Sequence, residues 1–121
     1  MLYLWIAIAG GGGAVLRFSV ARFFSYLGMV GFPYATLLVN FLGSFAIGYL
    51  ALALQEKWQV SYDVRMAILT GFLGGFTTYS AFSLETLLML QQGNVVKAVV
   101  YLLFTVIFCL GACALGIVLA R

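Results

Sequence analysis

Long apolar runs, separated by short polar or glycine-containing segments, make up almost the whole chain of 121 residues. A hydrocarbon core of ~30 Å takes about 20 residues of helix. The runs therefore predict one domain, residues 1–121, of four membrane-spanning helices at about residues 2–26, 34–54, 64–90 and 95–120. Apolar and polar residues do not alternate as they do in membrane β-strands, so we expect an all-α integral membrane protein.

Local signals mark the ends of these spans. Pro33, the only proline, precedes the second span, where its fixed φ suits the start of a helix. We expect Asp63 to cap the N-terminus of the third helix. Residues 2–16 lack the positively charged start of a secretory signal, so we interpret them as part of a retained span.

Composition excludes several classes of function. Hydrophobic residues are 65% of the chain and charged residues 7%, whereas soluble proteins carry roughly 25% charged residues. The chain has no histidine and two cysteines, which argues against histidine general-base chemistry and the usual zinc sites. We expect no enzymatic activity. The Lys and Arg residues are scattered, unlike those of a nucleic-acid-binding surface.

Four spans place both chain termini on the same side of the membrane. The basic residues then divide equally, with Lys57, Arg65 and Arg121 on the terminal side and Arg17, Arg22 and Lys97 on the other. This division gives almost no positive-inside bias. Oppositely inserted copies could then pair as an antiparallel dimer, like the inverted repeats of transporters. The alternative is one topology fixed by weaker signals.

Each span also holds two small residues four apart, which allow helix backbones to approach closely in lipid. The pairs are Gly10 and Ala14, Ser44 and Gly48, Gly71 and Gly75, and Ala112 and Gly116. Chance spacing is the alternative in a chain with 14 glycines. Together the pairs favour a compact helix bundle.

The third span is a poor continuous helix at its centre. Three glycines lie within residues 71–75, and two β-branched residues, Thr77 and Thr78, follow. Backbone groups freed at mid-membrane must be satisfied by protein, water or an ion. We expect a break that forms an ion site, with carbonyls for a cation and a half-helix N-terminus for an anion. The alternative is a continuous helix with back-bonded hydroxyls.

Several polar and aromatic residues lie inside the spans. Asn40 must face protein or a water-filled path, because an unpaired amide in hydrocarbon is costly. Tyr79 and Phe82 share a helix face, where they either pack or offer ring edges to an anion. Glu85 either forms a salt bridge with a basic residue of the same side or serves as a hydrogen-bonding vestibule group. In the fourth span, a stripe of weakly polar groups is either a packing seam or a set of donors for an anion: Tyr101, Thr105, Cys109 and Cys113.

Three strings, residues 10–17, 36–43 and 71–85, resemble the Fluc (CrcB) family of bacterial fluoride channels, and span count and loop lengths fit over essentially the whole chain. The third string is the most specific. The resemblance implies an antiparallel, dual-topology homodimer in the bacterial inner membrane. It also implies two fluoride pores, a structural sodium ion where the broken helices meet, and no organic cofactor. The implied activity is passive, fluoride-selective export that relieves fluoride toxicity.

The resemblance assigns individual residues as well. Gly74 and Thr77 match the positions whose carbonyls hold the sodium ion, and Asn40 matches the pore amide. Phe82 matches one of two pore phenylalanines whose ring edges line the ion path. The other matches are a polar track on the fourth helix (Tyr101, Thr105), a vestibule group near one pore end (Ser80, Glu85) and the motif arginine (Arg17).

The chain departs from the family pattern at several positions. Tyr79 stands where the family usually has Phe, and its hydroxyl could bind fluoride, block the path or require rehydration. Ala81 stands where Thr is common, and Cys109 and Cys113 replace small hydroxyl residues of the track. These changes affect the throughput and selectivity that the resemblance implies.

Two other classes of small membrane protein are alternatives to a fluoride channel. Small multidrug resistance transporters share dual topology but depend on an acidic residue in the first helix, whereas the first acid here is Glu56, in a loop. A non-transporting membrane subunit would leave Asn40 and the interrupted third span without a reason. We therefore expect a fluoride channel.

Overall fold

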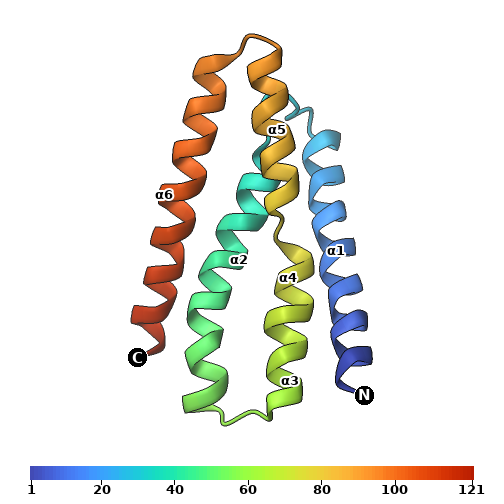
Figure 1. The fold of residues 1–121 in the computed structure, drawn as a ribbon, viewed down its shortest axis with the longest axis vertical. Coiled ribbons are helices and arrows are strands. Elements are labelled where there is room, and N and C mark those ends of the chain that lie inside the picture. The colour runs from blue at the N-terminus through green and yellow to red at the C-terminus, as the bar shows by residue number, and fades with distance from the viewer.

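The computed structural model describes all 121 residues, and every element in it is helical (Figure 1). Four helices are long and apolar enough to cross a membrane, which confirms the predicted all-α, four-span fold. The spans are Leu2–Tyr26, Tyr34–Lys57, Tyr62–Gln91 and Val95–Ala120. The protein is a multi-pass membrane protein.

The first and fourth spans are each one continuous α-helix, whereas the second and third spans are made of more than one segment. The first span is α1 (Leu2–Tyr26) and the last is α6 (Val95–Ala120). The second span is α2 (Tyr34–Leu52), which continues as a π-helical segment, η1 (Ala53–Lys57). The third span consists of four pieces in chain order: α3 (Tyr62–Met66), the π-helical η2 (Ala67–Leu73), α4 (Gly74–Phe76) and α5 (Tyr79–Gln91).

The predicted N-cap of the third span is wrong. Ser61, rather than Asp63, precedes the first helical residue, and its hydroxyl accepts a long hydrogen bond of 3.5 Å from the Val64 N–H. The Ser61 backbone is extended, as an N-cap requires. Asp63 lies in the first turn, where its carboxylate still complements the helix dipole.

The broken span changes its neighbour along its length. Before the break, η2 and α4 pack against α1, whereas α5 packs against α6 beyond it. The most extensive packing in the bundle joins α2 and α6. Both termini lie at one end of the molecule, and the α1–α2 and α5–α6 connections lie at the other (Figure 1).

Glycines bring the backbones together along two seams. A Cβ at Gly48 of α2 would lie 2.2 Å from the Cys113 carbonyl oxygen of α6. On the other side of the bundle, a Cβ at Gly13 would lie 2.1 Å from the Phe72 carbonyl oxygen. Neither position has room for a side chain, so these contacts fix how closely the helices approach.

Little of the chain is shielded within one protomer. Eighteen of the 121 residues are buried, and many large apolar side chains point outward. A bilayer solvates such a surface. The largest buried cluster lies beyond the break, between α5 and α6, and consists of Phe82, Met89, Ala98 and Tyr101.

Candidate functional site at the interrupted third span

The third span is interrupted at Thr77 and Thr78, near the middle of Tyr62–Gln91. Their backbones are extended, with φ −86° and ψ 162° at Thr77 and φ −152° and ψ 120° at Thr78. The predicted break is confirmed, and the non-helical connection between α4 and α5 is visible in Figure 1. Glycines before it and β-branched residues within it lower the helix propensity at this point.

The two threonines close the new helix ends. The Thr77 N–H and hydroxyl both donate to the Leu73 carbonyl, each at 3.0 Å. The Thr78 hydroxyl accepts a hydrogen bond of 3.1 Å from the Ala81 N–H and so caps α5. The break is thus stabilised by its own side chains.

Asn40 of α2 holds the break through both ends of its amide. Its Nδ2 donates to the Thr78 carbonyl at 2.9 Å, and its Oδ1 accepts from the Thr78 N–H at 2.8 Å. A side-chain amide has two N–H donors. One donor of Asn40 is therefore left for another acceptor.

The interruption leaves backbone carbonyls without their helical donors. In a continuous helix the Thr78 N–H would bond to the Gly74 carbonyl and the Ala81 N–H to the Thr77 carbonyl. Here those donors bond to Asn40 and to the Thr78 hydroxyl instead. The Gly74 and Thr77 oxygens are therefore available to another partner, and Gly74 lies exposed on the protomer.

Arg17 of α1 satisfies a third carbonyl at the break. Its Nε donates to the Gly75 carbonyl at 3.1 Å. The contact is part-buried and joins residues 58 positions apart in the chain. Arg17 thus ties α1 to the end of α4.

Gly43 of α2 makes room for the break on the opposite side. A Cβ at this position would lie 2.1 Å from Thr77 Cγ2, far closer than van der Waals contact. The absence of a side chain lets Thr77 pack directly on α2. Gly43 therefore helps to determine where the third span can be interrupted.

A cavity of about 440 Å³ lies beside the break. Residues of α2, α6 and both halves of the third span line it, including the polar residues Asn40, Ser44, Thr77, Thr78, Tyr79, Thr105 and Cys109. The Thr105 hydroxyl is buried and has no hydrogen-bond partner. Such groups are rare in native structures and call for an explanation.

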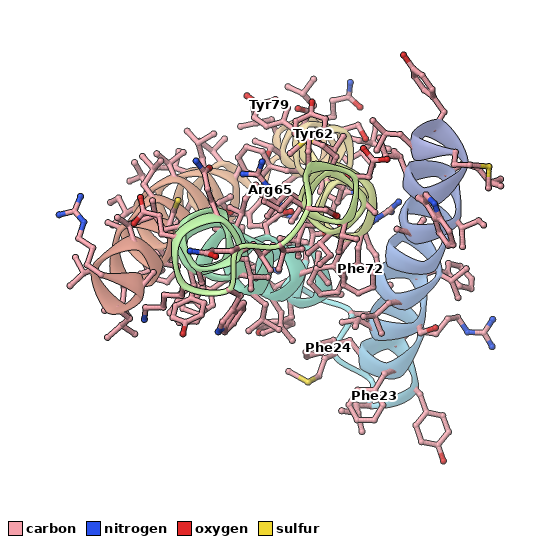
Figure 2. All side chains as sticks on the ribbon, turned by 90° about the horizontal axis from the view of Figure 1, so that it is seen from below. Phe23, Phe24, Tyr62, Arg65, Phe72 and Tyr79 are labelled. Atoms are coloured by element: carbon pink, nitrogen blue, oxygen red, sulfur yellow. The ribbon has the colours of Figure 1, made fainter.

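Aromatic rings continue from the cavity toward α6. Phe82 lines the cavity, is 5% exposed, and packs edge-to-face with Tyr79 and Tyr101 at centroid distances of 5.7 and 5.1 Å. Tyr79 is 79% exposed and lies at the edge of the bundle (Figure 2). Its ring therefore faces the surroundings of the protomer rather than the protomer's core.

Glu85 is held by hydroxyl groups and not by a basic residue. Thr36 Oγ1 donates to Glu85 Oε2 at 2.9 Å, and the Tyr101 hydroxyl donates to Oε1 at 3.0 Å. Of the two alternatives for Glu85, the salt bridge is wrong. Lys97 instead donates to the Gly31 carbonyl at 3.1 Å.

Residues 4–117 match the family described as CrcB-like protein, Camphor Resistance (CrcB). The chain belongs to the CrcB family. Its relatives include proteins named fluoride-specific ion channel FluC. The protein from Methylococcus capsulatus is 42% identical over 96% of this chain and 51% of its own length. That from Desulforapulum autotrophicum is 40% identical over 98% and 95%, and that from Shewanella amazonensis 45% identical over 93% and 90%. The chain thus spans about half the length of the Methylococcus relative.

Most residues predicted for the site of this CrcB protein meet at the cavity. Its lining includes Gly74, Thr77, Asn40, Tyr79, Phe82, Thr105 and Cys109. Five predicted residues lie outside that lining, namely Arg17, Ser80, Glu85, Tyr101 and Cys113. Ser80 is exposed, and its Oγ lies 3.2 Å from Thr78 Oγ1. Tyr101 and Glu85 form a separate polar group, nearer the connection between α5 and α6.

Sequence reasoning missed four contributors to the CrcB site. They are Thr36, Gly43, Ser44 and Thr78. A signal for Thr36 was present, because it lies one helical turn before Asn40 and so shares its face. Gly43 and Ser44 meet the site through packing with distant parts of the chain. Thr78 had a local signal, because a threonine directly before a helix is a typical N-cap.

Proposed function

We propose that this chain forms a passive channel that is selective for fluoride. The observation that carries the proposal is that two residues lining one cavity each keep an unused donor: Thr105 its hydroxyl, and Asn40 its second N–H. Fluoride holds its hydration shell strongly, so a pore must replace that shell with donors and still release the ion. Hydroxyl and amide N–H groups can replace water as donors to the ion, and because they are neutral and few they still release it. The names of the relatives support fluoride as the ion.

Ring edges and the Glu85 group extend this path. The positive edge of an aromatic ring attracts an anion weakly, and Phe82 lies between the cavity and Tyr101. The Tyr101 and Thr36 hydroxyls donate to Glu85. At the vestibule, these hydroxyls would turn from Glu85 to donate to the departing ion, and would return to Glu85 once the ion has entered water.

The working unit in this proposal is an antiparallel pair of chains. Gly74 and Tyr79 are exposed near the centre of the span, where lipid cannot satisfy an unpaired carbonyl. A second copy would cover this surface. The equal division of basic residues between the two ends supports insertion in both orientations.

The Gly74 and Thr77 carbonyls fit a structural sodium ion between two such copies. They are hard oxygen ligands without helical donors, which is the donor set that unwound helices offer to Na⁺. When bound, the ion would neutralise the carbonyl dipoles of both breaks. Asn40 and Arg17 would hold the surrounding backbone in place.

The direction of transport would follow from acid–base chemistry. Hydrogen fluoride crosses membranes as a neutral acid and dissociates in the more alkaline cytoplasm. The trapped anion then leaves through the channel down its own gradient. No coupling to another energy source is needed for this export.

Replacing Thr105 by Val tests the proposed donor, because it removes the hydroxyl and preserves the shape of the side chain. Purified protein in liposomes is assayed with a fluoride electrode, with chloride efflux as the selectivity control. Thr86→Val is the matched control, since the Thr86 hydroxyl bonds back to the Phe82 carbonyl at 2.7 Å and does not line the cavity.

A hydrogen bond to a charged group contributes about 1.5–3 kcal/mol, so Thr105→Val should slow fluoride efflux roughly 10- to 150-fold. Thr86→Val should conduct like the parent. Equal rates for the two variants would remove Thr105 from the pathway. Absence of fluoride efflux from the parent would overturn the proposed function itself.

A further inference from the structure

Cys109 places a thiol in the cavity beside the break. Thr105 lies one helical turn earlier on α6, is 8% exposed, and carries the buried hydroxyl that has no partner. The other cysteine, Cys113, does not line the cavity. Its backbone carbonyl lies against Gly48, where α2 and α6 pack without room for a side chain. The chain thus has two free thiols in different surroundings.

We propose that Cys109 is a covalent inhibitory site for small compounds of soft metals, such as mercuric chloride. The inhibitory effect rests on the proposed channel function, whereas the metal site itself does not. Thiols are the ligands that soft metals prefer over oxygen donors. Mercuric chloride is a small neutral molecule and can reach a cavity within the bilayer.

The reaction needs no oxidant and no preformed thiolate. A thiol in apolar surroundings carries little thiolate, but a coordinating metal deprotonates it outright. The Cys109 S–H bond breaks and its proton leaves to water, an S–Hg bond forms, and one Hg–Cl bond breaks to release chloride. The second chloride stays on mercury, and neither sulfur nor mercury changes oxidation state.

The surroundings of Cys109 suit this product. The retained chloride is a hydrogen-bond acceptor, and the unpaired Thr105 hydroxyl is a donor one turn away. The adduct would share the cavity of about 440 Å³ with Asn40 and Phe82. It would therefore occupy the space in which the anion is proposed to lose its water.

Two single variants separate the thiols. Cys113→Ser keeps only the cavity thiol, and Cys109→Ser keeps only the thiol at the α2–α6 contact. Each protein is reconstituted in liposomes, and its fluoride efflux is compared before and after mercuric chloride, then after excess dithiothreitol. Intact-mass spectrometry of the same samples counts the adducts.

The parent and Cys113→Ser should each gain an adduct and lose efflux by about tenfold or more, because the adduct fills the path. Dithiothreitol should restore the rate. Cys109→Ser should keep its own untreated rate. Inhibition of Cys109→Ser equal to that of Cys113→Ser would overturn the proposal, as would an adduct on Cys113→Ser with unchanged efflux. If no untreated protein conducts fluoride, the proposed function fails, and Cys113→Ser without an adduct would still refute the metal site.

Discussion

Asn40 holds the break through two hydrogen bonds to Thr78, and the proposed function gives it a second task as a donor to the ion; substitutions test both. Asn40→Ala removes both hydrogen bonds to Thr78, of 2.8 and 2.9 Å, and also removes the second N–H donor. Asn40→Asp keeps an oxygen that can accept from the Thr78 N–H but loses both N–H donors. Both variants should lose flux, and both should lose stability, because the aspartate sets a carboxylate oxygen against the Thr78 carbonyl where Nδ2 donated at 2.9 Å.

The structure sets the size of each effect. An orphaned buried backbone donor costs about 1–3 kcal/mol, and Asn40→Ala leaves the Thr78 N–H without its acceptor. The lost donor to a charged ion, worth about 1.5–3 kcal/mol, should slow efflux roughly 10- to 150-fold in both variants.

Two assays measure these effects. Fluoride-electrode efflux from liposomes gives the rates, and unfolding in mixed SDS and mild detergent gives the stabilities. Parent-like efflux from Asn40→Asp would show that the second N–H does not serve the ion. An Asn40→Ala protein as stable as the parent would refute the role of Asn40 in holding the break.

Other substitutions test the surroundings of the break. Gly43→Ala places a Cβ 2.1 Å from Thr77 Cγ2 and should lower the free energy of unfolding by about 1–3 kcal/mol; Gly11→Ala, which meets no atom within 4 Å, should not. Tyr79→Phe removes a hydroxyl from an exposed ring and should preserve or raise fluoride efflux, so a large fall would assign a necessary role to the phenol. Glu85→Gln deprives one hydroxyl, of Thr36 or Tyr101, of its acceptor and should slow efflux. The variant Glu56→Gln should not, because Glu56 lies in η1 at the end of the second span and not in the loop that the sequence suggested; equal rates would remove Glu85 from the path.

Sequence patterns were sufficient for the fold and for the position of the break. Apolar runs of membrane-spanning length predict four helices because no other element satisfies its backbone in lipid. The break is confirmed because low helix propensity at residues 71–78 is a local property. The same reasoning places a polar partner beside Asn40, since its amide cannot remain unpaired in hydrocarbon.

Sequence patterns could not supply the partners that tertiary packing creates. The bonds from Asn40 to Thr78 and from Arg17 to Gly75 join residues 38 and 58 positions apart. The sequence places Thr36 on the same helix face as Asn40, but only the packing of α2 against α5 and α6 reveals that its partner is Glu85. Charge alone suggested a salt bridge for Glu85, but hydroxyl donors lie closer to its carboxylate than any basic group.

The most direct test of selective conduction is the reversal potential of the purified protein in a planar bilayer. Chloride is kept equal on both sides, and fluoride differs tenfold. A fluoride-selective pathway predicts current that reverses near the fluoride equilibrium potential, about 59 mV from zero for a monovalent ion. Reversal at zero, or no current carried by fluoride, would contradict it.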